Sequence, residues 1–251
     1  MTETRRETRV LDAVVTLVDS LLDDFDVVEL LTDLAEHCTQ LLDVTSAGLL
    51  LAGPRGQLHL LAATSEESRE LELFQLQSEE GPCLDCYATG HPVTVADLSA
   101  EYQRWPRFVG AATEAGFASV HAIPMRAAGT TLGALGLFGS KPGHLEDADL
   151  LVARTLAHVA CVALLQEHSP TPATVQPRLR SALAGRIVVE QAKGYLHESL
   201  GVPIPEAFTL LRSYARTHGD HLTEVCRRLI SDPDAAQPLL DALRSSTAPP
   251  A

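Results

Sequence analysis

The chain has 251 residues, of which 45% are hydrophobic and 21% are charged, and its formal net charge is −14 at pH 7. This composition excludes a disordered chain and suffices for one large domain or two smaller ones. The start is polar, and no apolar run approaches the roughly 18 residues that span a bilayer, so we expect a cytoplasmic protein that does not enter a membrane. Five unevenly spaced cysteines fit a reducing compartment better than a disulfide scaffold.

The charge is unevenly distributed along the chain. Residues 1–169 carry 10 Lys+Arg against 25 Asp+Glu, a balance of −15, whereas residues 176–231 carry 8 against 5, a balance of +3. An acidic body followed by a small basic module is one interpretation, and chance on a short segment is the other. The basic segment is a candidate for contact with phosphate groups.

The first part of the chain alternates helical and strand patterns. Apolar residues at helical spacing predict two opening helices, with Asp26 as the cap of the second. Two pairs of apolar runs, 46–53 with 57–64 and 118–127 with 130–139, each flank a short turn and predict antiparallel hairpins. Short helical segments lie between the hairpins, and a long helix over 146–166 ends this part. The fold class is therefore α+β, an antiparallel sheet with flanking helices.

This order of elements, together with "EEGPCLDCYATGHPVTVADL" and "SVHAIPMRAAGTTLGALGLFGS", resembles a GAF domain, and we assign residues 8–168 to it. The resemblance implies a sensor of a small molecule or another signal, and the family is usually dimeric. GAF ligands vary widely, so the signal and any cofactor stay unidentified.

Cys83 and Cys86 form a C-x-x-C pair in "GPCLDCY" and are the candidate signal-sensing residues. The helix dipole favours the thiolate of a cysteine at the start of a helix. Packing or pocket lining, redox sensing and metal binding all stay open for this pair. A zinc site usually needs four ligands, and His91 and His121 stand at no spacing that predicts one, so we expect no metal.

The chain carries no motif of a known catalytic site. G-x-S-x-G, P-loop, G-x-G-x-x-G and H-E-x-x-H patterns are all missing from the sequence, so we expect a protein that is not an enzyme. One catalytic alternative stays open, because some GAF-like proteins reduce free methionine sulfoxide with cysteines at the pocket. In that case the C-terminal helices would only dimerise a redox enzyme.

A proline-rich segment separates the two parts of the chain. We expect a linker or a broken helix at 169–177, a three-helix module at 178–232 and a C-terminal tail at 233–251, whose last residues, "SSTAPPA", we expect to be disordered. On the first helix of the module, Arg186, Lys193 and His197 fall on one face together with Glu190. This face is either a solvated surface with an Arg186–Glu190 ion pair or a binding surface.

Gly194 favours the binding surface. A glycine inside a helix costs about 1 kcal/mol relative to alanine, so its presence beside Lys193 suggests that a backbone or a base approaches there. Packing against another helix is the alternative explanation for this glycine.

The segment "RIVVEQAKGYLHESLGVPIPEAFTLLRSYARTHGDHLTEVCRRLI" resembles an ANTAR domain. The resemblance implies a three-helix RNA-binding module that, as a dimer, holds paired hairpin loops of a leader RNA and prevents a terminator from forming. The motif positions that would face the loops are Ala192, Lys193, Gly194, Arg212, Tyr214, Ala215 and Arg216. Cys226 in place of a small alanine, and Ile204-Pro205 in place of a Ser/Thr cap, depart from the family pattern.

The residue types agree with the RNA assignment. RNA loops present unstacked bases and closely spaced phosphates, which cations and flat side chains recognise. We therefore expect a signal-responsive, RNA-binding transcription antiterminator that acts as a homodimer, because a dimer that touches two loops gains from effective concentration.

Overall fold

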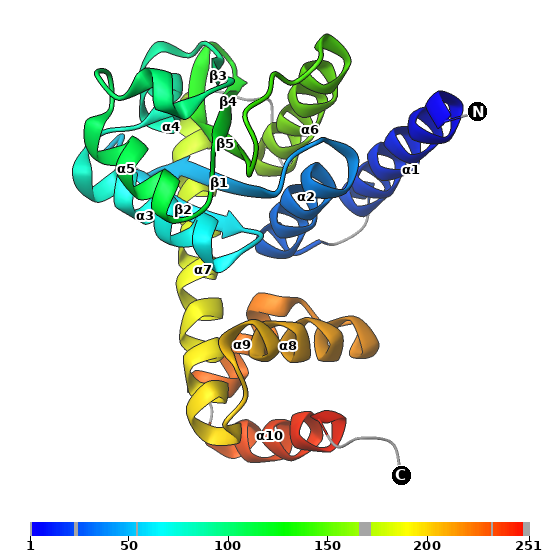
Figure 1. Ribbon diagram of the computed structural model, residues 1–251. Coiled ribbons are helices and arrows are strands. Elements are labelled where there is room, and N and C mark those ends of the chain that lie inside the picture. Colours follow the sequence, from blue (N-terminus) through cyan, green and yellow to red (C-terminus); the bar gives the residue numbers. More distant parts are fainter. Residues whose placement is uncertain (1, 23–24, 54, 166–171, 232, 248–251) are drawn as a thin grey trace. The chain divides into compact units, whose positions relative to one another are not determined.

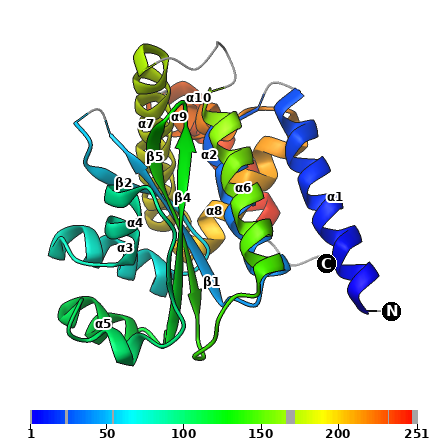
Figure 2. The ribbon, with the colours of Figure 1, turned by 90° about the horizontal axis from the view of Figure 1, so that it is seen from above.

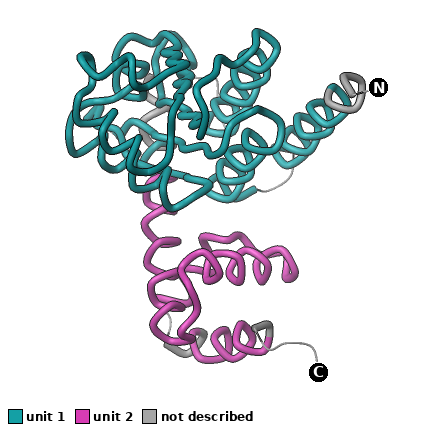
Figure 3. The backbone as a smooth tube through the Cα atoms, in the orientation of Figure 1, with its two compact units in different colours: residues 1–180 teal, residues 181–251 magenta. Residues whose placement is uncertain are grey.

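The computed structural model describes residues 2–22, 25–53, 55–165, 172–231 and 233–247. The chain divides into two compact units, Met1–Arg180 and Ser181–Ala251, which Figure 3 colours separately. Each unit is described by itself below.

The first unit is a five-stranded antiparallel sheet between two layers of helices. The strand order is β2-β1-β5-β4-β3. The two predicted hairpins, β1–β2 and β4–β5, are therefore joined by the antiparallel pairing of β1 with β5. Figures 1 and 2 show α2 and α6 on one face of this sheet and α3 and α4 on the other. The elements are α1 (Thr2–Leu22), α2 (Val27–Leu41), β1 (Ser46–Ala52), β2 (Leu58–Ala63), α3 (Glu66–Ser78), α4 (Pro82–Thr89), β3 (Val93–Val95), η1 (Leu98–Glu101), α5 (Pro106–Glu114), β4 (Ser119–Ala127), β5 (Thr130–Gly139) and α6 (Asp147–Leu165).

The sequence patterns explain where these elements begin and what they bury. All seven residues of β1 are buried, as a continuous apolar run at the centre of a two-faced sheet requires. The Asp26 carboxylate accepts hydrogen bonds from the backbone N–H groups of Val28 and Glu29, which confirms the predicted cap of α2. The 3₁₀ turn η1 was not predicted, because four residues are too few for a periodic pattern.

Helix α6 is the most apolar helix of the first unit. Of the helices that the structure describes, it is the one with the length and composition to cross a membrane, yet half of the residues in its apolar stretch are buried within the protein. It packs against β4 and α2, and Asp147 and Asp149 stand in its first turn. Burial against the sheet therefore explains its apolar character.

The second unit consists of helices, and its boundaries differ from those expected. The predicted linker at 169–177 is helical from Pro172, because α7 runs over Pro172–Leu200, while residues 169–171 lie outside the described part. Pro172 stands at the first helical position, where a proline has no hydrogen bond to lose. Helices α8 (Ile204–His218) and α9 (Leu222–Ser231) follow, and Gly219 ends α8 with φ +68°.

A further helix, α10 (Pro233–Thr247), occupies most of the segment that we expected to be a C-terminal tail. It packs against α9 and α8. Ala236, Leu239, Leu240 and Leu243 are buried, at the i, i+3, i+4, i+7 spacing of an apolar helix face. The expectation of a tail from residue 233 was therefore wrong, and the expected three-helix module is a four-helix unit in its described part.

Candidate functional site

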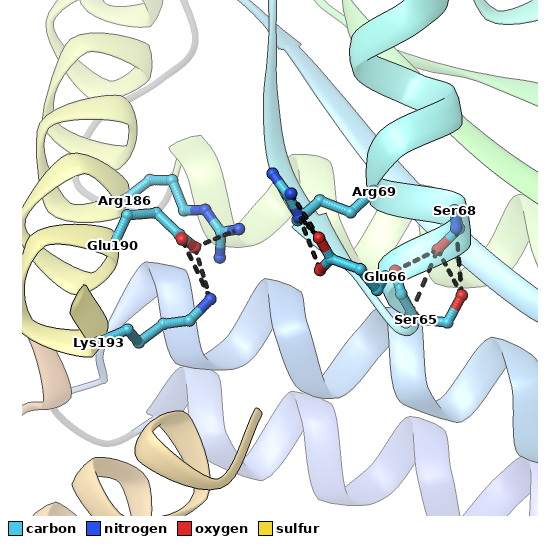
Figure 4. A network of polar contacts seen from close by, with 7 residues as sticks. All are labelled: Ser65, Glu66, Ser68, Arg69, Arg186, Glu190 and Lys193. Atoms are coloured by element: carbon cyan, nitrogen blue, oxygen red, sulfur yellow. Dashed lines mark hydrogen bonds and ion pairs between the residues drawn. The ribbon is translucent and has the colours of Figure 1, made fainter. Parts of the chain in front are cut away.

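An ion-pair cluster on α7 contains two of the predicted RNA-binding residues. The Glu190 carboxylate lies 2.5 Å from Nη2 of Arg186 and 2.9 Å from Nζ of Lys193 (Figure 4). The Arg186–Glu190 pair is thus present, as the solvated-surface interpretation expected. The Glu190 carboxylate is therefore shared by two cations.

The burial of this cluster corrects the expectation that Lys193 is an exposed side chain. Lys193 is only 8% exposed, and the Arg186 side chain is 13% exposed. The long side chains of Lys and Arg pack their methylene groups against apolar neighbours and keep the charged end at the surface. Lys193 therefore contributes to packing as well as to charge.

Phe208 on α8 connects this cluster to a third cation. Its ring centroid lies 5.8 Å from Nζ of Lys193 and 6.0 Å from Cζ of Arg212. Both distances are in the range of cation–π attraction. Phe208 was missed at the sequence level, although its i,i+4 spacing to Arg212 is the signal that could have identified it.

The remaining predicted residues divide between surface and interior. Gly194, His197 and Arg216 are exposed, and Tyr214 is half-buried. Ala192 and Ala215 are fully buried, so in this structure they pack inside the unit and do not face a ligand. Alanine at these two positions has a side chain small enough to fit into the closely packed interior of the unit.

Gly194 lies beside open space. A Cβ atom built on this residue would meet nothing within 4 Å, so the alternative that the glycine is needed for helix packing within the chain finds no support. His197 has a structural contact, because its Nδ1 lies 2.8 Å from the Val202 carbonyl oxygen at the end of α7. A carbonyl only accepts hydrogen bonds, so Nδ1 carries the proton.

A stacked ring pair lies on the last turns of α8. Tyr214 and His218 have ring centroids 3.9 Å apart at an interplanar angle of 20°. His218 was not predicted, but it stands four residues after Tyr214 on the same helix face. Flat rings of this kind, with His218 exposed and Tyr214 half-buried, can stack on unpaired bases.

The candidate signal-sensing cysteines lie in the interior of the first unit. Cys83 and Cys86 are both fully buried residues of α4, and all five cysteines of the chain are free and buried. Burial, and next the neighbouring Glu72 and Cys86, raise the pKa of the Cys83 thiol well above its ordinary value, and burial raises the pKa of Cys86 to about 12. The expectation that the helix dipole favours the Cys83 thiolate was therefore wrong, since desolvation outweighs the dipole.

Glu72 is the centre of the polar cluster around Cys83. The Gln75 amide donates to its carboxyl group, the Cys83 Sγ lies 3.6 Å from its Oε1, and the Cys83 N–H donates to Gln75 Oε1 at 3.1 Å. Glu72 is completely buried, and burial raises its pKa to about 8. Gly48 and Gly136 make room for it, because a Cβ on either would lie 2.7 or 2.5 Å from Glu72 Oε1.

The structure offers no support for a metal site at the histidines considered above. Among the described residues, no group of three His, Cys, Asp or Glu side chains is placed to hold a metal ion. His121 is buried in β4, and burial lowers its pKa, whereas His91 is exposed after α4. These two histidines are therefore not brought together with the cysteine pair into a cluster.

Comparisons with known proteins identify both units. A family model described as "GAF domain" matches residues 26–164, and one described as "ANTAR domain" matches residues 178–230. The chain belongs to the GAF domain family and carries an ANTAR domain after the GAF domain. An ANTAR domain implies an RNA-binding regulator, and a GAF domain implies a sensory part, so the architecture is that of a regulatory protein.

A solved structure supports the GAF fold of the first unit. The GAF domain of a phosphoenolpyruvate-protein phosphotransferase from Coxiella burnetii is 16% identical, with a TM-score of 0.51 over 63% of this chain and 94% of that chain. A free methionine-R-sulfoxide reductase from Neisseria meningitidis, solved with its substrate, is also 16% identical, with a TM-score of 0.49 over 69% of this chain and 91% of that chain. The Coxiella burnetii structure indicates the fold, and at 16% identity it indicates nothing of the activity. No curated protein matches the chain.

Proposed function

We propose that the chain is a signal-responsive RNA-binding regulator that acts as a transcription antiterminator on paired hairpin loops of a leader RNA. The observation that carries the proposal is the meeting of Arg186, Lys193 and Arg212 around Glu190 and Phe208 within the ANTAR domain. Three cations from two helices at one place provide the charge that a phosphate backbone requires.

The chemistry of the face supports RNA loops over a protein partner. A phosphate group that approaches Arg186 and Lys193 can take over the hydrogen bonds that Glu190 now accepts. Gly194 leaves open space on the exposed side of α7, and the Tyr214–His218 ring pair provides a stacking surface. The proposed RNA-binding residues are Arg186, Lys193, Gly194, His197, Phe208, Arg212, Tyr214 and Arg216.

The proposal includes a homodimer in the cytoplasm without membrane attachment. A single ANTAR domain offers few cations, and two copies that contact two loops of one RNA bind more tightly through effective concentration. The GAF domain would receive a small-molecule or redox signal and change how the RNA-binding domains are presented. Cys83 and Cys86 stay candidates for a redox signal, although their raised pKa values disfavour a fast thiolate reaction.

Crosslinking in cells followed by sequencing of the bound RNA tests the proposal. We expect leader transcripts with two neighbouring hairpins to be enriched. In a titration with such an RNA, Arg216→Ala should weaken binding roughly threefold to tenfold and reduce the salt slope by about 0.7. Arg227→Ala, an exposed arginine of α9 paired with Glu224, is the matched control and should bind as the wild type does.

The same experiment separates the redox-enzyme alternative. A GAF-type reductase would turn over free methionine sulfoxide and lose that activity in Cys83→Ser, while enriching no RNA. Turnover without RNA binding would therefore overturn the proposed function.

A further inference from the structure

A basic hollow of about 540 Å³ opens on the surface of the first unit, away from the cysteine pair in the interior. It is formed where the end of α4, the β4–β5 turn and the middle of α6 come together. Two arginines and two histidines, Arg126, Arg154, His91 and His158, line it, and its lining includes no aspartate or glutamate. All four side chains belong to exposed residues.

Two arginines in one hollow without an acidic residue stand out in this domain. Residues 1–169 contain 25 Asp+Glu and only 10 Lys+Arg, so acidic residues, which could serve as ion-pair partners, outnumber basic ones. Other arginines of the unit have such partners, in the pairs Arg69–Glu66, Arg104–Asp85 and Arg107–Glu80. Neither Arg126 nor Arg154 forms an ion pair with a residue that the structure describes. Like charges without counter-charges repel one another, and a bound anion would relieve that repulsion.

Arg126 is held in position at the hollow. Its Nη1 donates a hydrogen bond of 3.2 Å to the carbonyl oxygen of Gly90, which ends α4 with φ +67°. A Cβ at position 90 would lie 3.6 Å from Arg126 Nε and 3.1 Å from Thr131 Oγ1, so the glycine allows this close approach. One hydrogen bond leaves the other N–H donors of the guanidinium for a ligand, in a geometry that suits carboxylate or phosphate.

The rest of the lining indicates an organic ligand. Arg154 and His158 stand one turn apart on α6, so both can reach one anionic group from the same helix face. His91 Nδ1 lies 2.8 Å from the Thr89 carbonyl oxygen, which leaves Nε2 for other contacts. Pro92, Ile123 and Pro124 add apolar surface next to the cations. An inorganic ion would not use that surface, whereas a molecule with an apolar part would.

We propose that this hollow binds a small organic oxyanion, a molecule with a carboxylate or phosphate group and an apolar part. The inference rests on the proposed function, because it names the chemical class of the signal that the GAF domain of an RNA-binding regulator receives. Arg126 and Arg154 bind the anionic group, and the proline and isoleucine side chains contact the apolar part.

Calorimetric titration of the full-length chain at low salt tests the site with three probes. Phenyl phosphate and phthalate carry the two possible anionic groups, and benzyl alcohol is the uncharged comparison. At least one dianion should bind saturably with one site per chain, and benzyl alcohol should not bind. The dianion that binds more tightly identifies the phosphate or the carboxylate as the group recognised.

Two variants locate the binding. Arg154→Gln should weaken the dianion by about tenfold or more, since one charge-assisted contact is lost from an exposed helix position. Arg55→Gln removes an exposed arginine elsewhere in the same unit and should leave the affinity unchanged. A thermal unfolding curve of Arg154→Gln like that of the wild type shows that the fold is kept.

Two results would overturn the inference: neither dianion saturates the wild type, or Arg154→Gln and Arg55→Gln bind alike. RNA titration without a probe is run in parallel on the same proteins. Saturable dianion binding that Arg154→Gln weakens supports the site even if no RNA binds, and that outcome would count against the proposed function alone. RNA binding without saturable dianion binding would support the proposed function and overturn the inferred site.

Discussion

Two glutamates at the centres of polar clusters behave differently in the two units. Glu72 in the GAF domain is completely buried, and its hydrogen-bonding neighbours Gln75 and Cys83 carry no positive charge. Glu190 in the ANTAR domain has a side chain that is 38% exposed, and it pairs with Arg186 and Lys193. Burial raises the pKa of Glu72 to about 8, so this residue is a neutral acid over most of the physiological range.

The difference shows which cluster can exchange partners with a solute. A neutral, buried carboxyl group contributes to stability through packing and hydrogen bonds. A ligand can reach it only if the domain opens. The Glu190 side chain is 38% exposed, so another anion can approach it and compete with it for Arg186 and Lys193. We therefore place the response to RNA at Glu190 and its cations, and we assign Glu72 to the stability of the sensor domain.

The largest expected effect concerns the charge of Glu72. Its folded-state pKa lies above the ordinary value of 4.5, so its contribution to stability is fully present below about pH 4.5 and is lost as the pH rises toward 8. Glu72→Gln cannot ionise and should avoid this loss. The free energy of unfolding of the variant, relative to the wild type, should therefore rise by roughly 3 kcal/mol between pH 5 and pH 8.

Urea unfolding at several pH values measures this difference. Glu67→Gln, which changes an exposed residue of the same helix α3, is the control and should follow the wild type. If the free energy of unfolding of Glu72→Gln differs from that of the wild type by the same amount at every pH in this range, Glu72 is not a buried, neutral acid.

A smaller effect is expected from filling the space beside Glu72. In Gly136→Ala the new methyl group would lie 2.5 Å from Glu72 Oε1, 2.9 Å from Cys83 Sγ and 3.1 Å from Phe138 Cζ. Crowding in a closed interior destabilises by about 2 kcal/mol. The free energy of unfolding in urea should fall by that amount, whereas Gly143→Ala, which has nothing within 4 Å, should change it by less than about 0.5 kcal/mol. Equal stability of the two variants would show that the interior around Glu72 is not closely packed.

The main elements of the fold were predictable because their patterns are long. The hairpins β1–β2 and β4–β5 and the helices α2 and α6 each present a period over six or more residues. Helix α10 was missed although Ala236, Leu239 and Leu243 have helical spacing, because its two prolines and the polar end suggested a tail. The continuation of α7 back to Pro172 was missed for the same reason.

The site was predictable in residue types but not in burial. Helical spacing placed Arg186, Glu190 and Lys193 on one face, and the structure shows them joined. The spacing alone does not say that Phe208 from another helix covers Lys193, because that contact depends on how α7 and α8 pack. The burial of Glu72 was likewise not predictable, since its helix begins with the charged residues Glu66, Glu67, Arg69 and Glu70, and Gly48 and Gly136 lie far away in sequence.

Lys193→Ala tests whether the ion-pair cluster of Arg186, Glu190 and Lys193 also stabilises the fold. The variant loses a largely buried methylene chain and one ion pair, so the free energy of unfolding should fall by about 1 kcal/mol. RNA affinity should fall roughly fivefold, and the salt slope should decrease by about 0.7. Filter-binding titrations at several salt concentrations, together with urea unfolding, measure both. An unchanged salt slope would mean that Lys193 meets no phosphate, which leaves it a packing residue.

The smallest expected effect on stability, and the sharpest separation of fold from function, comes from Gly194→Ala. Gly194 is exposed within α7, and an added Cβ meets nothing within 4 Å, so alanine should raise the free energy of unfolding by up to about 1 kcal/mol through its better helix propensity. Within the described chain nothing therefore requires a glycine at this position.

If a base or a phosphate of the RNA occupies the open space, the same methyl group must weaken binding while the protein becomes more stable. Stability and affinity then change in opposite directions, which distinguishes Gly194→Ala from a variant that binds weakly because it folds poorly. Thermal melts and RNA titrations on one preparation measure the two quantities together. A more stable variant with undiminished affinity would show that RNA does not approach α7 at Gly194, and the proposed face would then be confined to the cations around Glu190 and the rings on α8.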